Sequence, residues 1–386
     1  MKLTGSLVFY IGNSVVKGAI VTHEKGKVPK ILTSRIRELP RYHERDRDHL
    51  ESKILQEFEA LLKDVKSVDF LHASNAKIKI ENACVMLSSP WYVSETSVIK
   101  IREQKPFVVT EQMIQNAKEN IAKAYRDSHK VDVSVLEQKI IRISLNGYPT
   151  FEPLKKKAQS LDMNVFTSFA RHSSIEQMKA LIDKHFHVKM IDVHSQSLMA
   201  FSIISDSWKE NSQYIIADIT SELTELVAVR KGIISEASSF PKGKRFLERT
   251  IATELGLTPE VAESLLKMRN NGQIEPELKA KVDGALEKAR KEWLSQLTEA
   301  LSVMSASSSL PSTFYVFPAR NVGRIFTDYI MSEEYQQFAF AEGEFKVIEV
   351  KVTDFAEHCA VAQGILPDLT LMLGSVFNNK ILHAKM

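Results

Sequence analysis

Glycine is scarce in this sequence. Only 14 of the 386 residues are glycine, about half of the roughly 7% usual in globular proteins. The closest pair, Gly12 and Gly18, stands six positions apart. The phosphate loops of P-loop and dinucleotide-binding proteins, and the nucleophile elbow of hydrolases, need glycines that lie closer together. The glycine spacing therefore excludes these three motifs.

An excess of one charge and long apolar segments are also missing, and cysteines are few. The 51 basic residues nearly balance the 48 acidic ones, so the chain lacks the basic field that attracts nucleic acid, and we expect no nucleic-acid partner. No apolar run is long enough for a signal peptide or a membrane span, so we expect no direct membrane insertion. The two cysteines, Cys84 and Cys359, stand in apolar surroundings that predict buried, reduced thiols. Together these absences predict a cytoplasmic protein.

One strand pattern occurs twice along the chain. Apolar residues alternate over 6–21 around Gly12-Asn13-Ser14, which predicts two strands joined by a tight turn, and a third strand is expected at 31–39. The second half repeats this meander at 214–219, 223–229 and 233–237. The repeat predicts a duplicated α/β fold, and a chain of this length is expected to form two or more domains.

Each half also carries an insertion. The first, from Trp91 to about Ser160, has the pattern of a small α+β module, with a helix that Thr110 can cap and a strand closed by the turn signal Asn146-Gly147. The second, over about 243–309, is almost wholly helical and has one long apolar stripe, which we interpret as core packing. The stripe consists of Val282, Leu286, Ala289, Trp293, Leu297, Leu301 and Met304.

This arrangement resembles the actin-like ATPase superfamily, whose α/β fold is ribonuclease H-like and duplicated into two lobes. It is similar to the bacterial branch that includes the FtsA and PilM families. FYIGNSVVKGAIV resembles the first phosphate loop, D-I-G-S-S-S-V-K, and IADITSELTELVAV resembles the second, D-I-G-G-G-T-T-D-L-A-V. SFPKGKRFLERTIA resembles the strand-to-helix step that follows. The turn Asn146-Gly147-Tyr148 and the pair Glu152-Pro153 resemble FtsA more than PilM.

The resemblance implies four parts. A small α+β domain is inserted in the first half of the duplicated fold and a helical subdomain in the second half. We expect the first core subdomain at 1–90 and 161–210, the inserted module at 91–160, the second core subdomain at 211–242 and 310–386, and the helical subdomain at 243–309.

The resemblance also implies ATP and Mg²⁺ as cofactors. In the superfamily, tight turns present N–H groups and hydroxyls to the phosphates, and a carboxylate holds Mg²⁺ through water. The matching positions, and so the implied nucleotide-binding residues, are Gly12, Asn13, Ser14, Lys17, Asp218, Gly243 and Glu263. We expect no metal site beyond this one, because His185 and His187 have no third ligand nearby in the sequence.

Several positions depart from the superfamily motifs. Tyr10 replaces an aspartate, and Thr220-Ser221-Glu222 replace glycines. A glutamate at 222 would repel phosphates. In the loop that contacts the nucleoside, Pro318-Ala319-Arg320 replace glycines, and the next glycine, Gly323, comes later than in the superfamily. In the helix that contacts the nucleoside, Leu266 replaces a lysine, and Lys267 stands one position after it. We therefore expect ATP binding to be weak or lost, and we expect no catalytic residue.

Two of the matching groups have alternative interpretations. Gly12-Asn13-Ser14 is either a phosphate clamp or a plain β-turn. Asp218 is either a metal organiser or a strand-end carboxylate that accepts hydrogen bonds from nearby N–H groups, and we favour the second interpretation.

The resemblance predicts an actin-like scaffold of bacterial cell division, similar to FtsA, that acts through protein–protein interaction. The module would bind a partner or a second copy of the chain, and the helical subdomain would bind an FtsZ-like division protein. A partner would recruit this cytoplasmic protein to the inner face of the cell membrane.

Two other functions are weighed against this one. A PilM-like adaptor of type IV pilus assembly would capture the N-terminal peptide of an inner-membrane pilus protein in a cleft near the module. It is favoured by the ending KILHAKM, which is too short for the membrane-binding helix that ends FtsA. A sugar- or acyl-phosphate kinase of the same fold is disfavoured by Tyr10 and Glu222.

Overall fold

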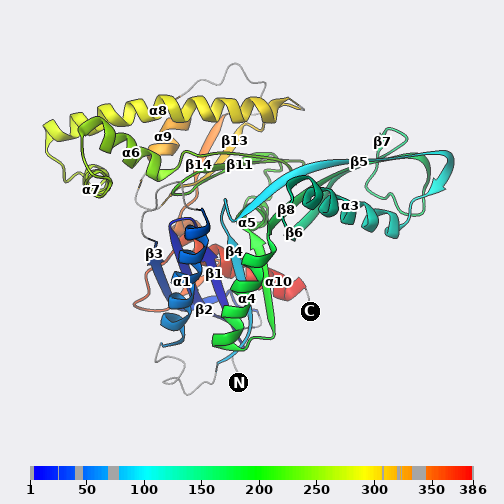
Figure 1. The fold of residues 1–386 in the computed structure, drawn as a ribbon, viewed down its shortest axis with the longest axis horizontal. Helices are drawn as coiled ribbons and strands as arrows, with labels where there is room; N and C mark the ends of the chain where they lie inside the picture. The colour runs from blue at the N-terminus through cyan, green and yellow to red at the C-terminus, as the bar shows by residue number, and fades with distance from the viewer. Residues whose placement is uncertain are drawn as a thin grey trace. The chain divides into compact units, whose positions relative to one another are not determined.

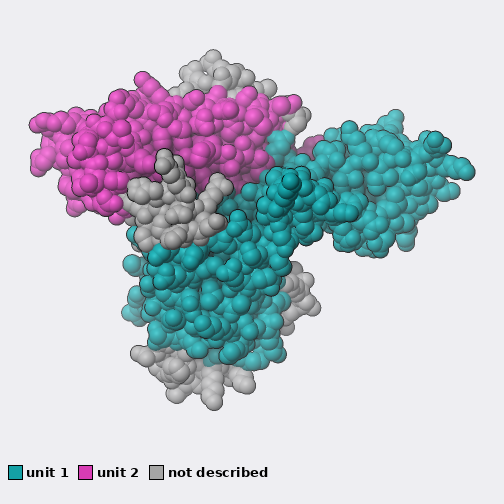
Figure 2. Space-filling model, in the orientation of Figure 1, with its two compact units in different colours: residues 1–203, 233–236, 355–386 teal, residues 204–232, 237–354 magenta. Residues whose placement is uncertain are grey.

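The computed structural model describes residues 4–24, 26–39, 47–67, 78–306, 308–319, 322, 324–332 and 345–384. Contacts divide the chain into two compact units, shown in two colours in Figure 2. Unit 1 comprises residues 1–203, 233–236 and 355–386, and unit 2 comprises residues 204–232 and 237–354.

Unit 1 is built on a sheet with the strand order β15-β3-β2-β1-β4-β9, of which β1 to β4 are labelled in Figure 1. Leu7 and Phe9 of β1 pack against helices α1 and α4, whereas Val8, between them, points to α10 on the other face. The strands are β1 (Thr4–Ile11), β2 (Val15–His23), β3 (Lys30–Glu38), β4 (Lys79–Leu87), β9 (Met190–Ser195) and β15 (Ala360–Val361). The helices are α1 (Arg47–Lys66), α4 (His172–Phe186), α5 (Gln196–Ser207) and α10 (Leu369–Ala384).

Unit 2 is built on a sheet with the order β12-β11-β10-β13-β14, and its helices share one large core with one face of that sheet. The strands are β10 (Tyr214–Ile219), β11 (Thr224–Arg230), β12 (Ile233–Phe240), β13 (Thr313–Phe317) and β14 (Lys346–Glu349). The helices are α6 (Lys244–Leu255), α7 (Pro259–Asn270), α8 (Pro276–Ser305), α9 (Ile325–Met331) and the short 3-10 helix η1 (Val352–Phe355). Proline at the first position starts α7 and α8, where its missing N–H costs nothing.

The two sheets share one topology. In unit 1, β1 pairs antiparallel with β2 and parallel with β4, and β4 pairs parallel with β9. In unit 2, β10 pairs antiparallel with β11 and parallel with β13, and β13 pairs parallel with β14. This shared order confirms the predicted duplication of an α/β fold.

The inserted module forms a sheet with the order β5-β8-β6-β7, and α3 covers one of its faces. Its elements are β5 (Tyr92–Val108), α3 (Glu111–His129), β6 (Val133–Leu145), β7 (Tyr148–Pro149) and β8 (Lys157–Arg171). Thr110 caps α3 by accepting a hydrogen bond from Met113 N at 3.2 Å, as predicted. The Asn146-Gly147 turn is also confirmed, with both residues at positive φ.

Some boundaries differ from the sequence-based expectation. The sequence pattern predicts that the module ends near Ser160 and that a last helix ends near Asn378; in the structure β8 runs through position 160 to Arg171, and α10 continues to Ala384. The pattern also predicts a helix from Asn321 to Met331; in the structure this helix begins at Ile325, and Asn321 itself lies outside the described residues. Both cysteines are buried and unpaired with each other, as expected. None of the helices formed by the described residues combines the length and the apolar character that a membrane span requires.

Candidate functional site

The first predicted loop is a short turn between β1 and β2. Gly12 N donates to Val15 O at 2.9 Å, and Leu39 N donates to Ser14 O at 2.8 Å. The indole Nε1 of Trp91 donates to Gly12 O at 2.9 Å. A Cβ atom at Gly12 would lie 2.9 Å from Cε1 of Tyr10, so the tyrosine ring fills the space beside this glycine. Hydrogen bonds from Leu39 and Trp91 and the ring of Tyr10 therefore fix the position of this turn within unit 1.

Lys17, on β2, forms an internal ion pair. Its Nζ lies 3.0 and 2.9 Å from the carboxylate oxygens of Asp368 and 3.1 Å from Oγ1 of Thr370. Lys17 is only 7% exposed, and its Nζ lies 5.3 Å from the centre of the Tyr10 ring. An ammonium group has three hydrogens to donate, and these acceptors occupy them. The sequence analysis did not identify Asp368 or Thr370 as partners of Lys17. The sequence shows only that Asp368 stands where it can cap α10, and in the structure its carboxylate accepts a hydrogen bond from Leu371 N at 3.2 Å.

The second predicted loop, 220–223, packs on the first turn of α6. Lys244 N donates to Thr220 O at 3.0 Å and Arg245 N donates to Ser221 O at 2.8 Å. A Cβ atom at Gly243 would lie 2.4 Å from Thr220 O, so only glycine allows this approach. A helix N-terminus can bind phosphate through its free N–H groups, but these two N–H groups of α6 donate to the protein's own carbonyls.

Glu222 pairs with two arginines of α6. Its carboxylate oxygens lie 3.0 Å from Nη1 of Arg245 and 3.0 Å from Nη1 of Arg249. The sequence alone suggested a carboxylate whose charge would repel phosphates. In the structure two guanidinium groups compensate that charge.

Asp218 lies on β10 directly opposite Glu225 of β11. Residues opposite each other in an antiparallel pair project on the same face, so the two carboxyl groups share one face of the sheet. In the described part of the chain, no three His, Cys, Asp or Glu side chains come together as a metal site would need.

Glu263, on α7, lies between two lysines. Its Oε1 is 3.2 Å from Nζ of Lys244 and 3.0 Å from Nζ of Lys267. Lys267 reaches Glu263 because residues four apart meet on one helix face. Lys244 also lies 3.2 Å from Oε1 of Glu248, which is 1% exposed. Lys244, at the start of α6, therefore joins α6 to α7.

The predicted site residues thus fall into two sets. One set lies in unit 1 and consists of Gly12, Asn13, Ser14 and Lys17. The other lies in unit 2, where Gly243, Glu263 and the 220–223 loop, which follows Asp218, come together around the start of α6. Of the adenosine-side loop, Pro318 and Ala319 follow β13, while Arg320, Asn321 and Gly323 lie outside the described residues.

A groove with a cavity volume of about 460 Å³ lies where the module meets the core of unit 1. One wall is residues 133–136 of β6, and the other is residues 191–193 of β9. Both walls are strand edges: within the described residues, β9 pairs with β4 alone, and this part of β6 pairs with β8 alone. His172 and Lys179 of α4 also line this space, which we call the junction groove.

Near the junction groove, a buried carboxyl fastens the module to the core. Glu137 of β6 accepts hydrogen bonds from the hydroxyl and, at 3.4 Å, from the backbone N of Ser195, at the end of β9. Burial raises the pKa of the Glu137 carboxyl above its ordinary 4.5, and hydrogen bonds from Ser168 and Ser195 oppose this rise.

Glu137 should make the stability of unit 1 fall as the pH rises. Because its pKa is higher in the folded chain, the folded state holds a proton that the unfolded state releases above about pH 4.5. Stability is then lost from that pH up to the folded pKa, by about 1.4 kcal/mol for each unit of pKa difference. In Glu137→Gln this loss should disappear when urea unfolding is compared at acidic and at mildly alkaline pH. Glu103→Gln, at an exposed position, should keep it; equal pH profiles for the wild type and Glu137→Gln would contradict the prediction.

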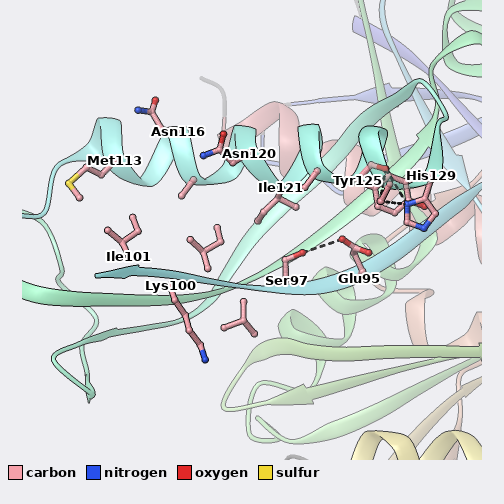
Figure 3. A pocket seen from close by; sticks show the side chains of 15 residues that line it. Glu95, Ser97, Lys100, Ile101, Met113, Asn116, Asn120, Ile121, Tyr125 and His129 are labelled. Carbon is pink, nitrogen blue, oxygen red and sulfur yellow. Dashed lines mark hydrogen bonds between the residues drawn. The ribbon is translucent and has the colours of Figure 1, made fainter. Parts of the chain in front are cut away.

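A second groove, of about 700 Å³, lies within the module between α3 and the edge strand β5 (Figure 3). Side chains of both elements line it, among them Ser97 and Ile101 of β5 and Asn120 and Ile121 of α3. The Ser97 hydroxyl donates to Glu95 at 3.2 Å.

No protein-family model and no curated protein matches this chain. Solved structures do. The likeness to the first one named below extends over nearly the whole chain and, together with the duplicated sheets, confirms the predicted duplicated α/β fold class. One of them is the "PilM-PilN type IV pilus biogenesis complex", with a TM-score of 0.61, 16% identity, and coverage of 97% of this chain and 98% of that chain. Others are ethanolamine utilization protein EutJ from Carboxydothermus hydrogenoformans (TM-score 0.44, 10% identity, coverage 96% and 88%) and apo psk41 ParM (0.42, 10%, 99% and 98%).

Proposed function

We propose that this chain is a PilM-like adaptor of type IV pilus assembly, which binds an extended N-terminal peptide of an inner-membrane pilus protein in the junction groove. The observation that carries this proposal is that β6 and β9, each at the edge of its sheet along these residues, line this groove. An extended peptide can add to such an edge through main-chain hydrogen bonds, while side-chain pockets select its sequence.

The chemistry of the junction groove suits a peptide better than an apolar ligand. Arg126 and Lys179 line the groove together with Asp132 and Asp192. Charged groups of both signs can pair with the charges of a peptide and set its direction. Recruitment by such a peptide would keep this cytoplasmic protein at the inner face of the membrane.

We further propose that nucleotide binding is weak or lost. ATP and Mg²⁺ do not fit the described residues as they are arranged, because their use would break existing contacts. Lys17 would have to leave Asp368, and the first N–H groups of α6 would have to leave the carbonyls of the 220–223 loop. These contacts favour an adaptor over an ATPase or a kinase.

The FtsA-like division scaffold, with an FtsZ-like partner or self-association, remains the alternative. It shares the actin-like fold, and its specific feature in this chain is the Asn146-Gly147 turn, which the structure forms. The similarity to PilM gives the adaptor at least equal support.

A groove-filling substitution tests the proposal. Ser134, half-buried on β6, lines the junction groove and bonds to His172 at 2.9 Å, so Ser134→Trp should block it. We expect about a tenfold or greater loss of affinity, or about 1.4 kcal/mol, for the fluorescently labelled N-terminal peptide of the cognate inner-membrane pilus protein, measured by anisotropy. Mg-ATP should leave the affinity unchanged.

Ser97→Trp is the matched control. Ser97 is likewise a half-buried, hydrogen-bonded serine on an edge of the module, but it lines the groove between α3 and β5. Its substitution should leave peptide binding unchanged. Equal loss in both variants, or retention of an FtsZ-like protein in place of the peptide, would contradict the adaptor.

A further inference from the structure

Strand β7 and the loop that joins it to β8 carry exposed apolar side chains. Phe151 is 97% exposed, Tyr148 is 78% exposed and Leu154 is 45% exposed. Single exposed apolar residues are common on protein surfaces and need no explanation. Here three stand within seven residues of chain, which is a local concentration of the kind that marks an interaction site.

The loop is ordered by hydrogen bonds and does not collapse over its own apolar groups. Thr150 N donates to Ile143 O and Lys155 N donates to Val109 O, both at 2.9 Å. At the base of the loop, Asn146 Oδ1 accepts from Gln159 N at 2.9 Å and from Ser160 N at 3.1 Å. A loop that is already ordered loses little conformational entropy when it binds a partner.

Positive charge follows the apolar residues directly. Lys155, Lys156 and Lys157 are all exposed, and Glu152 is the only acidic residue over 146–157. Lys157 pairs in register with Val108 of β5, another exposed apolar residue. We call Tyr148, Phe151, Leu154 and Lys155–Lys157 the tip surface; it lies at the β7 end of the module, labelled in Figure 1.

We propose that the tip surface binds the headgroup region of an anionic lipid bilayer. Aromatic rings and aliphatic side chains enter the boundary between headgroups and acyl chains, while lysines bind the negatively charged headgroups above it. The charge complementarity of three adjacent lysines favours this occupant over an apolar protein face. Such surface contact differs from the membrane insertion that the sequence argues against, and it would make membrane association direct.

This inference does not rest on the proposed adaptor function. The tip surface is a different part of the module from the junction groove, and vesicles containing no protein suffice to test it. A result against either proposal leaves the other intact.

Flotation of the full chain with lipid vesicles is the test. The wild type should float with vesicles of phosphatidylcholine mixed with phosphatidylglycerol at low salt, and much less with phosphatidylcholine alone or at high salt. Phe151→Ser should weaken binding by about tenfold, because burial of a phenylalanine side chain in an apolar environment is lost. Lys155→Gln and Lys157→Gln should each weaken binding by about fivefold.

Leu366→Ser is the matched control, because Leu366 is also a strongly exposed apolar residue of unit 1, at 84% exposure, but is not followed by lysines. It should float like the wild type. The proposal is overturned if the wild type ignores anionic vesicles at low salt, or if Phe151→Ser floats unchanged. It is likewise overturned if Phe151→Ser abolishes self-association in sedimentation velocity but leaves flotation intact, since the tip surface would then bind a second copy.

Discussion

Gly243→Ala should lower the free energy of unfolding of unit 2 by about 3 kcal/mol, the upper range for overpacking of a well-packed site. The added Cβ atom would lie 2.4 Å from Thr220 O and 2.8 Å from Leu223 N. Both are backbone atoms, so no side-chain rotation can relieve the contact. The 220–223 loop would have to move, and the first N–H groups of α6 would lose their acceptors. Urea unfolding followed by circular dichroism measures the change.

Gly284→Ala is the control, and it should change the free energy of unfolding in the opposite direction. Gly284 lies inside α8, and apart from its chain neighbours and the nearby backbone of the same helix, no atom lies within 4 Å of the position that a Cβ would take. Alanine there should stabilise the helix by about 0.5–1 kcal/mol, because glycine loses more backbone entropy on folding. If both variants destabilise unit 2, the close approach of the 220–223 backbone to Gly243 does not explain the effect of Gly243→Ala.

Trp293→Ala should destabilise unit 2 by about 3–5 kcal/mol, the usual cost of removing a large buried aromatic residue. Trp293 is fully buried on α8 and contacts the rings of Phe240 and Phe326. Its Nε1 also donates to Thr224 Oγ1 at 3.1 Å and to Lys242 O at 3.2 Å. The substitution would leave both a cavity and unsatisfied acceptors, and hydrogen exchange of the α8 amides would report the loss.

Two comparisons separate these contributions. Trp293→Phe keeps most of the volume but not the donor, so it should cost about 1–2 kcal/mol, in the range for leaving a buried acceptor unsatisfied. Trp208→Ala removes an indole that is only half-buried and should cost clearly less than Trp293→Ala. Equal effects of the two alanine substitutions would contradict the central position of Trp293.

Local patterns were enough to predict much of the fold. The alternation around Gly12 specified the β1–β2 hairpin, because one residue in two must face each side of a sheet. The 282–304 stripe predicted the buried face of α8, because its spacing follows the helical period. The end of α10 was harder to place, because its last residues, KILHA, are less apolar and carry no clear stop signal.

The candidate site could be located from motifs, but its contacts could not be predicted. Nothing in the sequence near Lys17 indicates that its partner is Asp368, 351 positions later. The arginines that compensate Glu222 were visible in the sequence, but their pairing depends on how the 220–223 loop packs on α6. The resemblance predicted a cleft near the module, but not which residues line it, because the two walls of the junction groove come from strands of different sheets.

Unit 1 includes residues 355–386, so it cannot complete its fold until these residues have been synthesised. The face of β1 that carries Val8 is covered by α10 at Gly374, so it stays open on the ribosome until α10 has emerged. Unit 2 is nearly continuous in sequence and can fold earlier. Exposed sheets of nascent chains are prone to aggregate. We therefore expect this face of β1 to be a site of aggregation in the nascent chain until α10 covers it.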